Sequence, residues 1–183
     1  MVTLIGMGSG KWEALSAQAQ QAVRSAGLVF GAKRLLAGLP ADCTARQFAL
    51  YQPADILETL AQTPGQDAAV LYSGDTGFYS GASGLLTPLR ALGIPARVYP
   101  GVSSIQLLSA ALGRPWQDWK LVSAHGCACD PVAECMMNRS VFFLTGGTET
   151  PASLCQKLTD AGMGEAHGVV GENLGTEAEA IRY

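Results

Sequence analysis

Most residues that could do chemistry lie in glycine- and hydroxyl-rich segments that directly follow short apolar runs. The segments are Gly6–Gly10, Tyr72–Gly81, Tyr99–Ser104, Leu144–Gly147 and Gly171–Thr176. Glycines let other groups approach the backbone closely. In parallel sheets, ligands bind in the crevice outside the carboxyl ends of the strands. We therefore expect these loops to line a binding site, with a plain turn or helix cap as the alternative for each.

The first loop, Gly6-Met7-Gly8-Ser9-Gly10, partly resembles a dinucleotide-binding fingerprint. Its spacing is G-x-G-x-G, however, and Lys11 stands where the fingerprint has its last glycine. The second expected strand ends in the apolar residues 29–32, with no carboxylate to bind a ribose. A phosphate-binding role is therefore disfavoured. A turn at the cleft and a loop that lines a substrate cleft both stay open.

Asp75 and Asn173 carry polar side chains suited to a nucleoside-like ligand. The Asp75 carboxylate can accept hydrogen bonds from hydroxyls or an amine, or it can cap the following turn. The Asn173 amide both donates and accepts, which suits the edge of an adenine. Ser103 and Ser104 come shortly after Pro100-Gly101, and either serine is predicted to cap the helix that follows. A serine that caps the helix could also bind a ligand.

His125 and the cysteines around it are weaker candidates. His125-x-Cys127-x-Cys129, with Cys135 nearby, lacks the paired spacings of structural zinc sites, so we predict no metal site. His125 is kept as a candidate catalytic residue against the alternative of a hydrogen-bonded loop histidine.

Composition excludes several classes of function. The formal charge is −3 and no run of Lys or Arg is present, which argues against a nucleic-acid surface. No stretch approaches the roughly 20 apolar residues of a membrane span. Five cysteines, an odd number, occur in a chain without an export signal, so reduced thiols and a cytoplasmic location are expected.

Apolar runs and helical periodicities alternate along the chain. We expect strands at 2–6, 27–30, 46–50, 67–72, 96–99, 119–123, 141–144, 167–170 and 180–183, and helices at 13–25, 32–37, 53–62, 81–92, 103–112 and 151–161. Short connections between alternating strands and helices predict an α/β fold with a mostly parallel sheet in the first half. The segment between the strands at 119–123 and 141–144 is expected to be irregular.

Taken in order, the motifs GxGxG, SGD-x-GFY, PGVSS and GENLGT resemble the tetrapyrrole (corrin/porphyrin) methyltransferase family. Within it, residues 31–36 (GAKRLL), 100–119 and 123–126 (SAHG) are most similar to the enzymes that methylate carbon 5 of cobalt-precorrin-7 or precorrin-6Y. The resemblance covers nearly the whole chain. It implies a two-lobed α/β fold, with a mostly parallel N-terminal sheet and a smaller mixed α/β C-terminal lobe.

The resemblance also implies lobes at 1–102 and 103–183, with the donor bound in the cleft between them. The chain stops at Tyr183, earlier than expected, which would leave the second sheet with an open edge. The implied reaction is methyl transfer from S-adenosylmethionine to carbon 5 of a cobalamin-pathway precorrin, with S-adenosylhomocysteine as the other product. The implied partners are the tetrapyrrole, a second copy of the chain, and a carbon-15 methyltransferase that also decarboxylates.

Carried over residue by residue, the resemblance assigns one set of residues to the donor and another to the tetrapyrrole. The donor set is Ser9, Gly74, Asp75, Tyr79, Ser103, Ser104, Leu144, Thr145 and Asn173, and the substrate set is Gly8, Lys33 and Arg34. Asp75 and His125 are the candidates for a catalytic role, and no general base is evident.

Three alternatives stay open from the sequence. A member of the same family could methylate another ring position or another acceptor. A nicotinamide-dependent oxidoreductase is disfavoured by the missing carboxylate after the second strand. A non-catalytic partner subunit would form a stable complex without turnover of its own.

Overall fold

The computed structural model describes residues 1–183, which form two compact units, Met1–Ser103 and Ser104–Tyr183. The first unit contains β1 (Val2–Gly6), the 3₁₀ turn η1 (Trp12–Ala14), α1 (Ala17–Ser25), β2 (Leu28–Phe30), α2 (Lys33–Leu36), β3 (Arg46–Phe48), α3 (Pro53–Gln62), β4 (Ala68–Tyr72), α4 (Ala82–Ala91) and β5 (Ala96–Tyr99). The second contains α5 (Ser104–Leu112), β6 (Lys120–His125), α6 (Pro131–Met137), β7 (Val141–Gly146), α7 (Pro151–Asp160), β8 (Val170–Glu172) and β9 (Ala180–Arg182).

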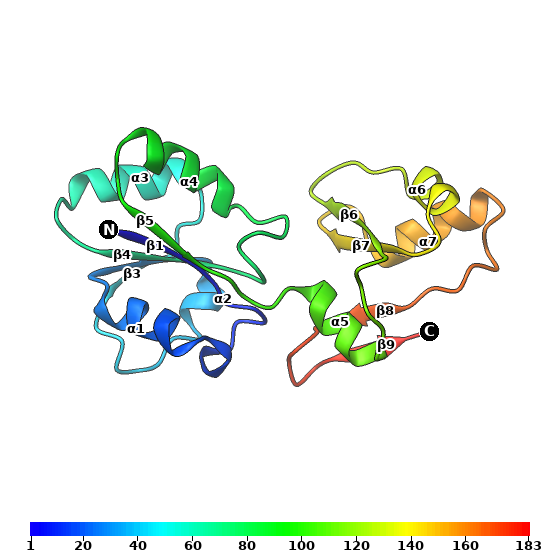
Figure 1. Ribbon diagram of the computed structural model, residues 1–183, viewed down its shortest axis with the longest axis horizontal. Coiled ribbons are helices and arrows are strands. Elements are labelled where there is room, and N and C mark those ends of the chain that lie inside the picture. Colours follow the sequence, from blue (N-terminus) through cyan, green and yellow to red (C-terminus); the bar gives the residue numbers. More distant parts are fainter. The chain divides into compact units, whose positions relative to one another are not determined.

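The strands of the first unit form one parallel sheet in the order β3-β2-β4-β1-β5, which confirms the predicted parallel sheet. Helices α1 and α2 cover one face, and α3 and α4 cover the other (Figure 1). Because both faces are covered, every residue of β1, β2 and β4 is buried, and these strands read as continuous apolar runs.

Each face of this sheet has its own apolar core. On one face, Leu4 and Phe30 pack with Ile56 of α3 and with Leu85 of α4. On the other face, the core includes the residues Ile5, Met7, Trp12, Ala19, Val23, Val29, Leu35 and Leu71. These two layers hold the strands rigidly, so the positions of the loops at their carboxyl ends are well defined.

The loops after β1 and β4 lie at the topological switch point of the sheet, where the strand order reverses. These two strands are neighbours, yet the chain leaves β1 for α1 on one face and leaves β4 for α4 on the other. Such a point opens a crevice at the carboxyl ends of the strands. The fold therefore places the two glycine-rich loops of the first half where a ligand site is expected.

The predicted continuous helix at 13–25 is wrong. Leu15 and Ser16 have extended backbones, and the chain divides into η1 and α1. The Ser16 hydroxyl accepts a hydrogen bond from Ala19 N–H, so this serine is the N-cap of α1. A serine hydroxyl satisfies a free N–H of the first helical turn, and this cap outweighs the periodicity that runs through it.

The second unit is smaller and mixed, as predicted. Strands β6 and β7 are parallel, and β8 and β9 form an antiparallel pair. The expected irregular segment after β6 contains α6, which Asp130 caps through hydrogen bonds from Val132 N–H and Ala133 N–H. The strand expected at 167–170 begins only at Val170, because the backbone pairing with β9 starts there. None of the helices in residues 1–183 has the length and apolar character needed to cross a membrane.

Candidate functional site

Three glycines bring the loops after β4, β1 and β5 into direct backbone contact. A Cβ atom placed on Gly101 would lie 2.2 Å from the Gly74 carbonyl oxygen and 2.6 Å from the Gly6 carbonyl. A Cβ atom on Gly6 would lie 2.6 Å from the Gly101 nitrogen. No side chain fits at either position, so the close approach of these loops requires glycine.

The first two glycine loops are also joined by backbone hydrogen bonds. Gly8 N–H donates to the Gly74 carbonyl at 3.1 Å, and Gly74 N–H donates to the Gly8 carbonyl at 2.8 Å. Both residues have left-handed backbones, with φ of 57° and 66°. The predicted substrate residue Gly8 and the predicted donor residue Gly74 are therefore direct neighbours.

Asp75 connects the loop after β4 to the loop after β5. Its Oδ1 accepts a hydrogen bond from Gly77 N–H at 2.8 Å, and its Oδ2 accepts one from Gly101 N–H at 3.1 Å. The turn-capping interpretation of Asp75 is confirmed by the first bond. The second bond joins the loops after β4 and β5, and no sequence pattern predicted it.

Ser103, a predicted donor residue, lies at the same edge of the sheet. It is 3% exposed, and its Cα would be 3.9 Å from a Cβ atom on Gly74. Thr76 adds a link that sequence reasoning missed, because its hydroxyl donates to the Tyr99 carbonyl at 3.5 Å. Ser9, next to Gly8, is partly exposed.

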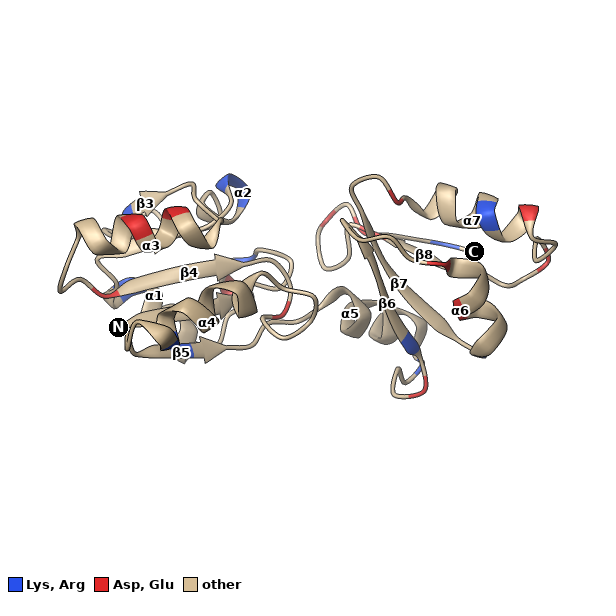
Figure 2. Cartoon of the chain, turned by 90° about the horizontal axis from the view of Figure 1, so that it is seen from above, with Lys and Arg blue, Asp and Glu red and all other residues tan.

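The cations of α2 lie beside these loops. The Arg34 guanidinium donates to the Ser73 hydroxyl at 2.5 Å and would contact a Cβ atom on Gly10 at 3.5 Å. Lys33 is exposed. Figure 2 shows that α2 is basic, whereas α3 on the opposite face of the sheet is acidic. A local positive charge therefore stands at the loop edge of a protein whose net charge is negative.

Tyr79 and Asn173 share an unusual backbone conformation. They are the two non-glycine residues of the chain with positive φ, at 47° and 50°. Left-handed backbone is costly for a bulky side chain such as tyrosine, and such costs tend to be retained at functional sites. Both residues belong to the predicted donor set, and the Asn173 amide also donates to the Ala178 carbonyl at 3.5 Å within its hairpin.

In the second unit, His125 and Gly146 end the paired strands β6 and β7. A Cβ atom on Gly146 would lie 2.9 Å from the His125 ring, so the imidazole packs directly on the glycine backbone. The predicted donor residues Leu144 and Thr145 pair with Ser123 and Ala124, one and two positions before this point. Ser104 begins α5.

Two of the thiols that follow His125 in the sequence, Cys129 and Cys135, lose their protons less readily than a free thiol. Burial raises the pKa of the Cys129 thiol, and the nearby Glu149 carboxylate raises it further. Burial also raises the pKa of Cys135, with a contribution from Glu134. A thiol must lose its proton to bind a metal well, and these surroundings oppose that loss. No group of three or more His, Cys, Asp or Glu side chains is arranged to hold a metal ion.

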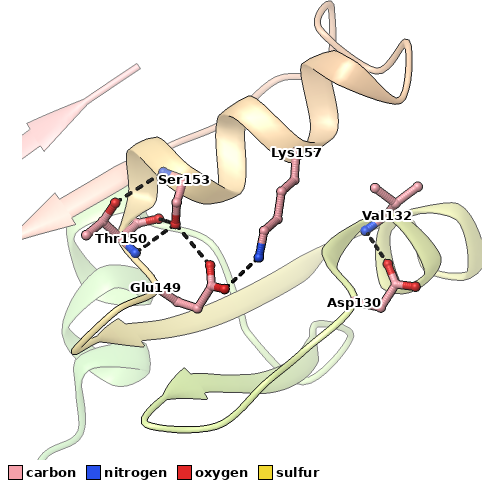
Figure 3. A network of polar contacts seen from close by, with 6 residues as sticks. All are labelled: Asp130, Val132, Glu149, Thr150, Ser153 and Lys157. Atoms are coloured by element: carbon pink, nitrogen blue, oxygen red, sulfur yellow. Dashed lines mark hydrogen bonds and ion pairs between the residues drawn. The ribbon is translucent and has the colours of Figure 1, made fainter.

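Glu149, which precedes α7, and Lys157, in its last turn, form an ion pair with a structural role (Figure 3). Thr150 and Ser153 form a reciprocal capping box, and Glu149 accepts hydrogen bonds from Ser153 and Lys157 at 2.9 and 2.5 Å. The Lys157 ammonium, and then Ser153, lower the pKa of Glu149. These groups fix the loop between β7 and α7.

The loops of the first unit are suited to a ligand that carries no phosphate. They offer glycine backbone and the exposed side chain of Tyr79, with its ring and hydroxyl. Backbone groups and hydroxyls can bind the ribose, adenine and amino-acid parts of an adenosyl donor. The fold and these loops define the class, an α/β protein whose glycine loops meet at the carboxyl edge of a parallel sheet, where proteins of this architecture bind their ligands.

Comparison with known proteins identifies the family within this class. Residues 1–182 match Tetrapyrrole (Corrin/Porphyrin) Methylases, and the chain belongs to this family. It is 32% identical to the cobalt-precorrin-7 C(5)-methyltransferase of Salmonella typhimurium, over 100% of this chain and 90% of that protein. It is 30% identical to the precorrin-6Y C(5,15)-methyltransferase [decarboxylating] of Sinorhizobium sp, over 98% of this chain and 44% of that longer protein.

A solved structure agrees in fold. The uroporphyrin-III C-methyltransferase of Thermus thermophilus, complexed with S-adenosylhomocysteine, superposes with a TM-score of 0.73 at 21% identity, over 99% of this chain and 81% of that chain. The chain is therefore a methyltransferase that uses S-adenosylmethionine as its methyl donor. The nicotinamide-dependent oxidoreductase considered from the sequence is wrong.

Proposed function

We propose that the protein methylates carbon 5 of a cobalamin-pathway precorrin. The observation that supports this ring position is similarity along the whole chain to enzymes named for carbon-5 methylation, at 32% and 30% identity. Methylation of a different ring position is the alternative. No dedicated general base is part of the proposal.

The donor supplies a methyl group on a sulfonium, which is already activated for transfer. Residues of this chain then have to position it, exclude water and leave room for the acceptor carbon. Alignment of two reactants can account for about 7–11 kcal/mol of a barrier. The rigid contact among Gly6, Gly74 and Gly101 is suited to this task, because it fixes the loops before any ligand binds.

We propose that Ser9, Gly74, Asp75, Tyr79 and Ser103 of the first unit form its part of the donor site. The resemblance gives Ser104, Leu144, Thr145 and Asn173 of the second unit a part in the same task. His125 also stays a candidate catalytic residue. The only structural observation behind this candidate is that its ring lies beside Gly146. The expected homodimer and the decarboxylating partner also stay predictions.

Gly8, Lys33 and Arg34 are proposed to face the tetrapyrrole. Precorrins carry peripheral carboxylates, and no carboxylate of the chain forms an ion pair with either cation. Arg34 keeps further N–H donors beyond the one that binds Ser73. A bidentate carboxylate contact can therefore form without loss of the Ser73 bond.

The test is a transfer assay with S-adenosylmethionine that carries a ¹³C methyl group. The purified chain is incubated with precorrin acceptors, with and without cobalt, and the product is examined by mass spectrometry and ¹³C NMR. The proposal expects one new methyl signal, at carbon 5. A methyl group at another position would replace the proposed ring position and leave the family assignment intact.

A paired variant tests the substrate residues. In Lys33→Ala/Arg34→Ala, the KM for the precorrin should rise about tenfold or more, since each lost charged contact is worth about 1.5–3 kcal/mol. The Kd for S-adenosylhomocysteine should stay unchanged. Arg90→Ala, which removes a cation on α4, is the matched control. An unchanged KM in the double variant would remove these residues from the substrate site.

A further inference from the structure

The Asp75 carboxylate joins two loops that follow different strands. Within the loop after β4 it accepts Gly77 N–H at 2.8 Å, and from the loop after β5 it accepts Gly101 N–H at 3.1 Å. These partners use different oxygens, so each carboxylate oxygen already has a backbone N–H directed at it.

We infer that Asp75 is a positioning residue that sets the spacing of the loops after β4 and β5, and acts on the donor through that spacing. The inference rests on the proposed function, because it needs these loops to bind the donor. It gives Asp75 no proton to accept during methyl transfer.

The packing around Gly101 explains why a charged acceptor is needed there. The backbone of Gly101 lies so close to the Gly74 carbonyl that a Cβ atom would be only 2.2 Å from it. The Gly101 N–H, which is partly buried, needs an acceptor at this crowded point. Oδ2 of Asp75 supplies it, and hydrogen bonds to charged acceptors are about twice as strong as neutral ones.

The other side-chain link between these loops is weaker. The Thr76 hydroxyl donates to the Tyr99 carbonyl at 3.5 Å, a long and neutral hydrogen bond. Loss of the Asp75 bond should therefore loosen the loop after β5, whereas loss of the Thr76 bond should have little effect. Thr76→Val keeps the shape of the side chain and is the matched control.

The variant Asp75→Asn tests whether Asp75 positions the donor loops or is needed only for folding. An asparagine has one acceptor oxygen, so it can serve Gly77 or Gly101 but presents an NH₂ group to the other N–H. We expect the Kd for S-adenosylhomocysteine, measured by calorimetry, to rise about tenfold, as expected for one lost charged hydrogen bond. The pH profile of kcat at saturating donor should keep the shape that it has in the wild type.

Hydrogen exchange provides a second readout that needs no ligand. The Gly101 amide should exchange faster in Asp75→Asn or Asp75→Ala than in the wild type, and as slowly as wild type in Thr76→Val. If Asp75→Ala does not fold, Asp75→Asn, which keeps one of the two bonds, still gives the answer.

Two outcomes would overturn the inference. Asp75→Asn that binds S-adenosylhomocysteine as tightly as the wild type, with slow Gly101 exchange, would show that the loops hold their spacing without the carboxylate. A large fall in kcat at saturating donor, with a lost limb of the pH profile, would make Asp75 a proton acceptor instead. A wild type that does not bind S-adenosylhomocysteine would contradict the proposed function, and the exchange experiment would still test the spacing.

Discussion

The two units of the chain stabilise their loops in different ways. In the first unit, 22 buried apolar residues lie on the two faces of a five-stranded sheet, and the loops at its edge meet through backbone contacts between glycines. In the second, six buried apolar residues support two two-stranded sheets, and side-chain caps and ion pairs hold the loops. The shape of the first set of loops thus depends mainly on backbone packing, with Asp75 as the side-chain link, and that of the second on capping side chains and ion pairs.

The difference implies different tolerance to substitution. A backbone contact with no room for a Cβ atom cannot adapt to a larger residue, whereas an exposed cap or ion pair contributes little and can be replaced. Each substitution below targets one side of this comparison. Because the chain has two compact units, unfolding should be followed by a probe in each.

The largest effect is expected at Gly101. Gly101→Ala places a Cβ atom 2.2 Å from the Gly74 carbonyl, so the loops after β4 and β5 must separate. We expect a loss of about 3 kcal/mol in the unfolding free energy of the first unit, with loss of S-adenosylhomocysteine binding. Urea denaturation and calorimetry measure the two effects.

Gly65→Ala is the control for Gly101→Ala. Gly65 has a left-handed backbone with φ of 80°, but no atom lies within 4 Å of its Cβ position. The variant should lose about 1 kcal/mol, the cost of the backbone conformation alone. Equal losses in the two variants would show that the contact among the three loops is not rigid.

The next largest effect is expected in the apolar cores, where the same substitution is made in each unit. Leu85 is 0% exposed within the core between α4 and the sheet, whereas Leu154 of α7 is 5% exposed in the smaller unit. Leu85→Ala should cost about 4 kcal/mol and Leu154→Ala about 2 kcal/mol in urea denaturation, because a denser shell leaves a larger cavity. A larger cost for Leu154→Ala would reverse the comparison.

A smaller effect is expected at the cap of α7. Thr150 accepts a hydrogen bond from Ser153 N–H at 3.1 Å. Thr150→Ala should lower the unfolding free energy of the second unit by about 1 kcal/mol. Thr148→Ala, at an exposed position two residues earlier, should have almost no effect. Thermal unfolding that shows no difference between the variants would remove the cap from the stabilising contacts.

The smallest effect concerns the ion pair of Glu149 and Lys157, which depends on pH. Hydrogen bonding to Lys157 lowers the pKa of Glu149 below its ordinary value of 4.5, and the same bond raises the pKa of Lys157 above 10.5. The stabilisation by Glu149 is therefore present above pH 4.5 and is lost as the pH falls through the lowered pKa. The stabilisation by Lys157 is lost only as the pH rises through its raised pKa.

Lys157→Met measures this pair. Its Tm should fall slightly below that of the wild type at pH 7 in low salt, and the difference should shrink in 1 M salt and as the pH falls through the lowered pKa of Glu149. A difference in Tm that is the same in low salt and in 1 M salt would be assigned to packing of the lysine chain.

The sequence predicted the parts of the fold that depend on local pattern. The apolar runs of β1 and β4 predicted buried parallel strands, and the glycines after them predicted loops at the sheet edge. The break before α1 and the presence of α6 were missed, although Ser16 and the Asp130-Pro131 pair are ordinary signals of a helix start. The hydrophobic periodicity continues across Ser16 and hides the first signal, and α6 has only seven residues, too few for a helical periodicity to stand out.

The contacts of the candidate site could not be predicted in the same way. The Asp75 bond to Gly101 and the contact of Gly101 with Gly6 join residues far apart in the chain. They depend on the strand order β4-β1-β5, which no local pattern contains. The left-handed backbone of Tyr79 also had no signal, since tyrosine rarely adopts that conformation, whereas asparagine adopts it often enough that Asn173 in a glycine-containing turn could have been predicted.

The most direct test of the donor site is an NMR titration of the protein labelled with ¹⁵N-glycine, using S-adenosylhomocysteine and then NAD as a control. The chain has 22 glycines, and the experiment therefore reports on each of the glycine-rich loops that follow the strands. We predict that the amide signals of Gly8, Gly74 and Gly101 shift with S-adenosylhomocysteine and not with NAD, while those of Gly65 and Gly93 stay unchanged. Binding of S-adenosylhomocysteine without any shift of the first three signals would contradict the assignment of these loops to the donor.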